Sequence, residues 1–496
     1  MSGPNSKSGA RLYQLLPAVY RERDNGDLSA YLDACGTLLD AIQQTLDQRL
    51  ADNFPDTPPA GLTCQDWLLP YFGKLLDVRL VSPEAVGRRA EIAKAVAWRQ
   101  AKGTLAVAEQ IAEAVGDMEV EIAEGWQRVA TMARIGIPLL PAGNFGVTPE
   151  PDRHISSEAA RHPALPAGTV DFRYASRAVN HPVACLGGHD WVQGNPHGVP
   201  CVIGGFDDAT RRTVDLRTPG WDHGHHHPRT LLLFAPPPAG FFDINMESIK
   251  WSDRAKPQYQ HLIAIEETPT FYRIRKLGGT RIRFTGPVTL DGHKDYVIEG
   301  FSFSTTVNCV HGNLFLRDVA APKVMAQRHG AEIPALTARD CLFRDVTTAR
   351  GLMRLEYCTV LRKTICEWLE ASDCIFIGTV QKDHPTRPPP RDGCVRFSRL
   401  PGLALGAVRV HQCSDDEPIF FNQIFGKQGC AALHPASSQA IRHGAEDGGE
   451  MGCYHDRHYV LRAEAVIDKL KDYLPLGLEA VLVYDKRLLC PIPIVK

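Results

Sequence analysis

The chain of 496 residues carries 55 Lys and Arg against 57 Asp and Glu, which gives a formal net charge of -2. Its length predicts about two to four domains, and a hydrophobic share of 44% with 23% charged residues excludes bulk disorder. The near-neutral charge argues against a dedicated nucleic-acid binder, because phosphate contacts need a basic surplus.

The sequence also lacks the usual export and membrane signals. The N-terminal residues have no signal-peptide apolar core, and the longest apolar stretch, residues 231–242, is broken by prolines and too short to span a bilayer. We therefore expect a chain that is made in the cytoplasm without membrane insertion. Its 14 cysteines include no C-x-x-C pair, which favours buried thiols over disulfides or the common zinc motifs.

Residues 1–124 have the pattern of a helical domain. Asp27 can cap a helix, and apolar side chains follow it at three- and four-residue steps. They are Leu28, Tyr31, Leu32, Cys35, Leu38, Leu39, Ile42, Leu46 and Leu50. A single amphipathic helix is marginal alone, so this stripe needs a partner surface, either within the chain or on another subunit. Periodicity does not separate these two interpretations.

Further helices are expected after a Pro-rich break at residues 54–61. A short one surrounds Pro70, and Ser82 caps another that runs to about Gln100. Gly103 then breaks the pattern, Thr104 caps the next helix, and a glycine at position 116 ends it.

Residues 125–280 are rich in His, Pro and Gly. This composition predicts an irregular β domain, with short strands near residues 230–234 and 261–265. A histidine run at residues 223–227 and the set His181, Cys185, His189, His197 and Cys201 could in principle bind zinc. No standard ligand spacing is present, so we favour a His-rich surface loop and two buried thiols.

Residues 281–496 contain a repeat. Six cysteines recur in similar local frames at intervals of 32, 17, 16, 20 and 19 residues: Cys309, Cys341, Cys358, Cys374, Cys394 and Cys413. A repeat of this length suits one coil of a right-handed parallel β-helix-like domain, in which equivalent positions stack and thiols fill a narrow interior. A helix at residues 464–473 and a strand at residues 478–484 could close one end. The expected fold class is thus multidomain α+β.

A catalytic role for the repeat region is the next possibility that the sequence raises. Polysaccharide lyases and hydrolases place two or three carboxylates on adjacent coils. Asp340 and Asp373 occupy equivalent positions, but Tyr357 holds that position in the coil between them. No thiol is marked as an activated nucleophile, and the glycines of residues 444–452 lack the Lys of a phosphate loop. We therefore expect that the chain is not an enzyme and that it has no catalytic residues, no cofactor and no metal site.

Several N-terminal segments, in order, resemble the tail protein I family of contractile phage tails and related contractile injection systems. They are LLPAVYR at residues 15–21, the long helix at 27–48, residues 64–78 with Pro70 and Gly73, and residues 88–116. The last segment contains the family's most distinctive element, "R.KGT", here Arg99, Lys102, Gly103 and Thr104. The resemblance covers about the first 120 residues, a quarter of the chain.

This resemblance implies a structural baseplate wedge component that helps to trigger sheath contraction. The implied partners are larger tail-protein-J-like wedge subunits, joined through a helical bundle, with sheath-initiator and hub or spike proteins, in a phage tail-like particle assembled in the cytoplasm. The candidate interface residues are Leu28, Tyr31, Leu38, Leu39, Ile42, Leu46, Arg99, Lys102, Gly103 and Thr104. The alternative is a carbohydrate-binding or carbohydrate-cleaving β-helix tail protein, for which Trp368 and Asp373 are the nearest candidates.

Overall fold

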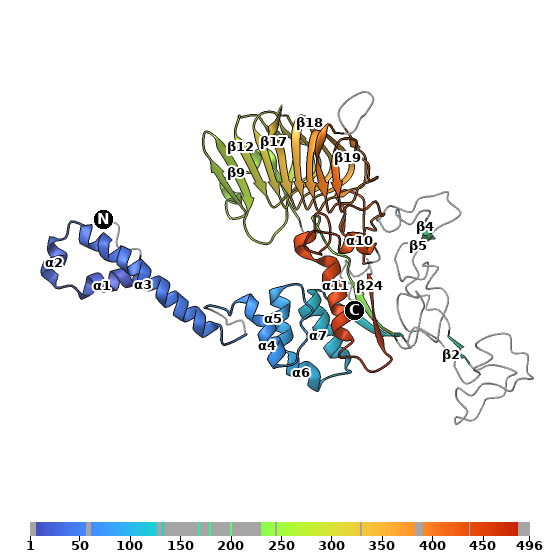
Figure 1. The fold of residues 1–496 in the computed structure, drawn as a ribbon, viewed down its shortest axis with the longest axis horizontal. Coiled ribbons are helices and arrows are strands. Elements are labelled where there is room, and N and C mark those ends of the chain that lie inside the picture. The colour runs from blue at the N-terminus through green and yellow to red at the C-terminus, as the bar shows by residue number, and fades with distance from the viewer. Residues whose placement is uncertain are drawn as a thin grey trace, which may run out of the picture. The chain divides into compact units, whose positions relative to one another are not determined.

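The computed structural model describes residues 6–55, 61–125, 230–243, 246–327, 330–381, 390–435 and 437–484. Between residues 126 and 229 it also gives the backbone of two antiparallel strand pairs, Thr131–Met132 with Ala167–Gly168 and Ala178–Val179 with Val199–Pro200. The chain divides into two compact units, Met1–Lys102 and Gly103–Lys496. The predicted α+β class is confirmed, with helices first and a β-solenoid later (Figure 1). The predicted domain boundaries at residues 124 and 280 stay predictions.

The first unit is helical throughout. Its helices are α1 (Lys7–Leu15), α2 (Ala18–Arg23), α3 (Asp27–Ala51), α4 (Leu69–Leu75), α5 (Ala85–Ala93) and α6 (Ala95–Gln100). Helix α1 folds back on α3, and Gly9 and Gly36 make the close approach possible, since a Cβ on Gly36 would overlap the Gly9 backbone. Ser6 donates from Oγ to Asp40 at 2.6 Å, which ties the start of α1 to α3.

Two predicted helix caps in this unit are wrong. Helix α3 begins at Asp27, but the carboxylate of Asp24 accepts hydrogen bonds from the backbone of Leu28 and Ser29, each at 3.0 Å. Ser82 does not cap α5, which starts three residues later. Instead the backbone N–H of Ser82 donates at 2.8 Å to the fully buried carboxylate of Glu91. In both cases a carboxylate accepts from a backbone N–H: Asp24 at the start of α3, and Glu91 from the residues before α5.

The second unit begins with α7 (Leu105–Gly116), which packs against α11 (Tyr459–Leu470). As predicted, Thr104 caps α7, because its Oγ accepts from Val107 N at 3.4 Å. Beside these helices lies a three-stranded sheet of β1 (Glu121–Glu124), β6 (Thr230–Ala235) and β24 (Glu479–Tyr484), in the order β1-β6-β24.

This sheet corrects the predicted end cap of the β-helix. Strand β24 exists close to the predicted bounds, but it pairs in parallel with β6 and with no described strand of the solenoid. The side chains around it pack in a second core with outward-facing solenoid residues such as Leu342 and Ile375. The C-terminal segment therefore covers a flank of the solenoid.

The solenoid makes about 6 turns over residues 282–411 and consists of three stacks of parallel strands. The first stack holds β7 (Glu247–Lys250), β10 (Ile282–Thr285), β13 (Phe301–Phe303) and β20 (Ile375–Phe376). The second holds β11 (Val288–Leu290), β14 (Val307–Cys309) and β21 (Val380–Gln381). The third holds β9 (Phe271–Lys276), β12 (Asp295–Glu299), β15 (Asn313–Arg317), β17 (Gly330–Arg339), β22 (Asp392–Arg396) and β23 (Arg409–His411).

Three longer strands run through more than one stack: β16 (Ala320–Ala326), β18 (Leu342–Glu356) and β19 (Thr359–Ser372). At the first coil, β8 (Ile263–Glu267) pairs antiparallel with β9 and Trp251 packs its ring at 5.1 Å from that of Phe284. These contacts cover the start of the solenoid.

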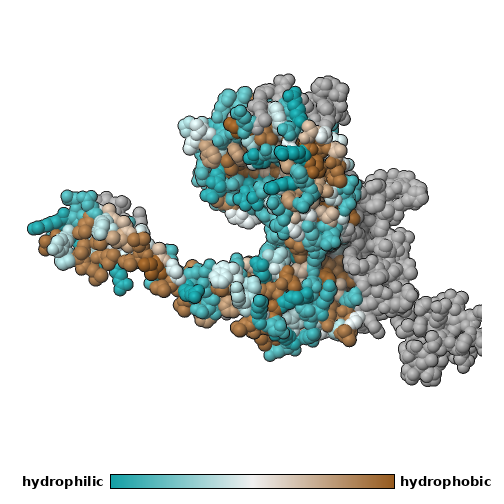
Figure 2. Space-filling model, in the orientation of Figure 1, coloured by the Kyte–Doolittle hydropathy of each residue, from teal (hydrophilic) through white to brown (hydrophobic). Residues whose placement is uncertain are grey.

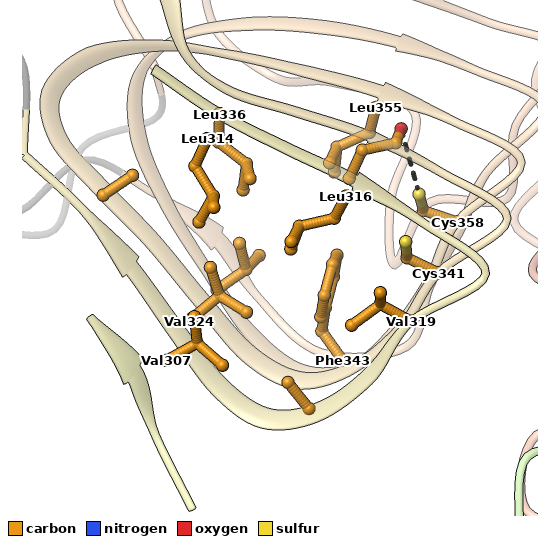
Figure 3. Close-up of a cluster of buried hydrophobic side chains, with 14 of the residues drawn as sticks. Val307, Leu314, Leu316, Val319, Val324, Leu336, Cys341, Phe343, Leu355 and Cys358 are labelled. Atoms are coloured by element: carbon orange, nitrogen blue, oxygen red, sulfur yellow. Dashed lines mark hydrogen bonds between the residues drawn. The ribbon is translucent and has the colours of Figure 1, made fainter. Parts of the chain in front are cut away.

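Side chains in the third stack alternate between the interior and the surface, as strand geometry requires. One inner row is apolar throughout: Ile274, Ile298, Leu316, Ala338, Leu355, Ala371, Val395 and Val410. Two outer rows, named so from here on, flank it. The first is Arg275, Glu299, Arg317, Arg339, Glu356, Ser372, Arg396 and His411; the second is Arg273, Val297, Phe315, Thr337, Arg354, Glu370, Cys394 and Arg409. Figure 3 shows how side chains from all three stacks meet inside the coil.

The predicted cysteine column is correct for part of its length. Cys341, Cys358 and Cys374 follow one another on successive coils, and each is fully buried. On the next coil the equivalent position is Ser398 instead of a cysteine. Its Oγ accepts a hydrogen bond from Cys374 N at 2.9 Å. Cys413 follows it. Cys309 belongs to another stack, between Leu290 and Ala326, and Cys394 lies in the second outer row.

Candidate assembly surface and corner seam

Helix α3 presents a row of apolar side chains to solvent. The exposed members are Tyr31 (66%), Leu38 (69%), Leu39 (45%), Ile42 (58%), Leu46 (59%) and Leu50 (66%). Leu28, at the start of the row, is half-buried. Figure 2 shows hydrophobic side chains gathered along this helix. Contiguous exposed apolar surface of this kind is uncommon on a monomer, so these side chains are a candidate interaction surface. We call this set the α3 row.

The α3 row is exposed because α1 covers a different part of the helix. Gly36 is the one α3 residue that is fully buried, and it lies under Gly9 of α1. Within the first unit, no described residue covers the row itself, so the helices of that unit do not bury it. Burial of each such side chain contributes about 1.5–3 kcal/mol, which a partner helix could recover.

The residues of the "R.KGT" element have local roles. The guanidinium of Arg99 donates to the carbonyl of Leu76 at 2.8 Å and to that of Asp77, so it closes the C-terminal end of α4. Lys102 is exposed. In the second unit, Gly103 has a φ of 87° and donates from its N–H to Tyr473 O at 3.0 Å, and Thr104 caps α7. The part of these four residues in any interface stays a prediction.

A second feature lies at one corner of the solenoid. The residue just before the cysteine column has a left-handed conformation in successive coils: Gly300, Asp318, Asp340, Tyr357, Asp373, Phe397 and Gln412. Asp accepts this conformation more readily than most residues, because its short polar side chain can bond locally. Asp340, Tyr357 and Asp373 thus occupy equivalent positions, as their local sequence frames predict.

A segment from much later in the chain runs along this corner. Residues 446–457 contact three corner residues, Asp318, Tyr357 and Asp373, and we call the assembly the corner seam. Arg457 donates to Asp318 at 2.8 Å, and the ring of His455 stacks on Tyr357 at 4.0 Å. The backbone N–H of Glu446 donates to Asp373 at 2.7 Å.

Further hydrogen bonds reinforce the seam from both sides. Cys453 N donates to Thr359 Oγ at 3.1 Å, and Gly452 N donates to the carbonyl of Asp373 at 2.9 Å. A Cβ on Gly452 would lie 2.6 Å from Thr359 Oγ, so only glycine fits there. The segment thereby fastens several coils to one another.

Two carboxyl groups of this region are held in an unusual environment. Burial raises the pKa of Asp340 to about 7, with a further contribution from the negative charge of Asp456. Burial raises the pKa of Glu450 to about 8. The Oε2 atom of Glu450 accepts from Val460 N at 3.2 Å, so this carboxyl group closes the start of α11.

The geometry bears on the carbohydrate-cleaving alternative. Asp340 is 6% exposed and Asp373 2%, and the corner seam contacts Asp373. The Asp373 carboxylate is engaged by Glu446 N and by Ser372 Oγ, at 2.7 and 2.6 Å. Trp368, the other candidate, is half-buried on β19. Both carboxylates are thus buried, and that of Asp373 holds the corner seam in place.

Within the described part of the chain, no group of three or more His, Cys, Asp and Glu residues is placed to hold a metal ion. The histidine run at residues 223–227 and the set from His181 to Cys201 lie outside the described residues. Among the helices described, none is long and apolar enough to cross a membrane.

The corner seam was not anticipated from the sequence. Its two sides are 73 residues apart at Asp373 and Glu446, and 139 apart at Asp318 and Arg457. The glycines of residues 444–452 are typical of a loop, but nothing near them indicates what the loop contacts. The spacing of the corner residues was the one sequence signal for the surface that it covers.

Comparison with known proteins gives one finding. Searches of curated proteins and of solved structures give no match. A family model matches residues 33–148, which include most of α3 and all of α4 to α7. The resemblance noted in the N-terminal sequence is thereby confirmed for this segment: residues 33–148 match the phage tail protein (Tail_P2_I) family.

Proposed function

We propose that this chain is a structural wedge component of the baseplate of a contractile tail or contractile injection system. The observation that carries the proposal is the α3 row, because it lies partly inside the matched family segment and is exposed in the isolated chain. A helix with one open apolar face fits a bundle with helices of other subunits.

The wedge would use the two units differently. The helices of residues 1–102 would join larger tail-protein-J-like subunits, and sheath-initiator and hub or spike proteins would be further neighbours. The solenoid would serve as a stiff element, because each coil is hydrogen-bonded to the next and the corner seam fastens several coils. A change of packing at the α3 row could transmit the signal for sheath contraction. No covalent chemistry is needed for this role, and we propose no catalytic residue or cofactor.

The proposal is tested by recovery of the tagged chain from the lysate of its native cell. Mass spectrometry of the eluate should find sheath, tube and a larger baseplate protein, and electron microscopy should show contractile particles. Recovery of the chain alone would contradict a role in a tail particle.

A further inference from the structure

Strand β24 lies at the edge of its sheet, and one side of it is unpaired within the described part of the chain. It pairs in parallel with β6, which in turn pairs with β1, and no other described strand continues the sheet. A free edge presents a row of backbone N–H and C=O groups, and folded proteins usually pair, cover or blunt such a row. The edge of β24 is therefore a position where a further strand can add.

A cavity of about 640 Å³ lies on the same side of this sheet as helix α11. Strand β24 lines it with Ala480, Leu482 and Tyr484, which alternate along the strand and so share one face. Helix α11 and the chain after it contribute Ile467 and Leu474, and both are half-buried. Figure 1 shows α11 and β24 next to each other. A strand added at the free edge would direct every second side chain toward this cavity.

We propose that residues 485–496 of the same chain occupy this edge as a fourth strand, antiparallel to β24. This segment, DKRLLCPIPIVK, follows β24 directly and lies outside the described residues. A return of the chain beside β24 needs only a hairpin connection, and connections of three to five residues are common. With a three-residue connection, Cys490 would pair with Leu482 and Ile492 with Ala480.

The apolar residues of the segment match the face of β24 that lines the cavity. Opposite residues of paired strands project to the same face of a sheet, so this register places Cys490 and Ile492 on the cavity side. Ile494 follows on the same face, opposite Leu478, which also lines the cavity. One thiol and two isoleucines would thus fill the cavity, and the apolar area that they bury favours the docked state.

The two prolines of the segment specify which of its edges can pair. Pro491 and Pro493 lack a backbone N–H and are two residues apart, so both point to the same edge of the strand. Cys490, Ile492 and Ile494 keep their donors on the opposite edge, which would face β24. Proline within sheets is confined mainly to edge strands, where it blunts the outer side. The segment therefore suits the last position in a sheet.

The charges around the cavity also suit this segment. Three acidic and two basic residues line the cavity, while burial lowers the pKa of His434 to about 3 and leaves it neutral. Residues 485–496 hold three basic residues and one acidic residue, so the two surfaces have opposite net charge. A covalently attached segment also has a high effective concentration at a neighbouring site, which favours it over a strand of a second chain.

Hydrogen exchange of the full chain, measured on peptides that contain β24, tests the proposal directly. Backbone N–H groups of a strand point alternately to its two edges. If the segment pairs with β24, slow exchange should extend to both edges of this six-residue strand. If the edge is free, about half of its N–H groups should exchange as fast as those of an exposed loop, and that result would overturn the proposal.

The variant Ile492→Asp places a charge over the apolar cavity and should release the segment. Exchange of the outer N–H groups of β24 should become at least about tenfold faster, while exchange in β6 and α7 should stay slow. Leu476→Asp is the matched control, because it adds the same charge at a fully exposed side chain in the turn before β24. It should leave this exchange unchanged within about twofold. Equal effects of the two variants, or no effect of Ile492→Asp, would contradict the proposal.

A cross-link distinguishes the chain's own segment from that of a second copy. Leu482→Cys places a thiol opposite Cys490 in the proposed register, at a Cα separation that a disulfide can span. Mild oxidation with oxidised glutathione should join these two residues within one chain, as mass spectrometry of proteolytic peptides would show. A link between two chains would overturn occupancy by the chain's own segment, and the absence of any link would overturn the proposed register.

Discussion

Cys358 and Cys394 have similar sequence contexts but opposite environments in the solenoid. Cys358 is fully buried, and its Sγ donates to Ala338 O at 3.4 Å (Figure 3). Cys394 is half-buried on the outer side, between Glu370 and Arg409. We expect Cys358→Asp to lower the free energy of unfolding of the second unit by about 3–5 kcal/mol, because it buries an unpaired charge. Thermal unfolding would measure the loss.

The control for that prediction is Cys394→Asp, which adds the same charge beside an exposed arginine. It should change the unfolding free energy by less than about 1 kcal/mol. Equal losses in the two variants, or none in Cys358→Asp, would refute the assignment of Cys358 to the interior.

Glu450 predicts a dependence of stability on pH. Its pKa in the folded chain is raised to about 8 from a usual value of 4.5. Between these values the folded state keeps a proton that the unfolded state has released, so the stability contributed by the neutral form is lost as pH rises toward 8. Glu450→Gln keeps a neutral side chain at both pH values. Its free energy of unfolding relative to that of the parent chain should therefore be up to about 4 kcal/mol higher at pH 8.5 than at pH 4.5.

The comparison requires thermal unfolding of both proteins at the two pH values. Glu446→Gln, an exposed acid in the same segment, serves as the control and should show no such pH-dependent gain. A constant difference between parent and Glu450→Gln across the pH range would show that Glu450 is ionised in the folded chain.

Among the structural elements, the corner seam can be tested at Asp373. Asp373→Ala leaves the N–H of Glu446 without its acceptor and places a less suitable residue at a φ of 57°. The expected loss of unfolding free energy is about 1–3 kcal/mol. Hydrogen exchange at residues 446–457 should accelerate, while exchange in the inner strands of the solenoid should stay slow.

Asp373→Asn separates the two contributions, because Asn keeps an acceptor oxygen and tolerates the left-handed conformation. It should lose less stability than the Ala variant. If neither variant changes exchange in residues 446–457, that segment is held by other contacts.

The elements differ in how far the sequence predicts them. The solenoid was predictable because its repeat is local: each coil supplies its own inward residues at a nearly constant interval. The cap at Asp24, the hydrogen bond from Ser82 N to Glu91 and the corner seam were not predictable, because each satisfies a backbone group with a residue outside the expected cap position or distant in sequence.

For the molecule as a whole, the position of the candidate assembly site was predictable from the sequence, but whether its side chains are buried or exposed was not. The three- and four-residue spacing placed the α3 row on one face of a helix. Whether the chain buries that face itself depends on packing against α1, which Gly9 and Gly36 direct to another side of α3. The exposed row is what connects the fold to the proposed role in a tail particle.

The most direct measurement is therefore incorporation of an α3 row variant into particles in the native cell. Leu38→Gln, Ile42→Gln and Leu46→Gln change three exposed side chains, so the helical content and the unfolding temperature of the isolated chain should stay close to those of the parent. Gln44→Ala, at a polar position on the opposite side of the same helix, is the control. The account predicts that the parent and control chains co-purify with sheath and tube proteins, whereas the row variant is recovered without them. Equal incorporation of the row variant would contradict the α3 row as the assembly surface.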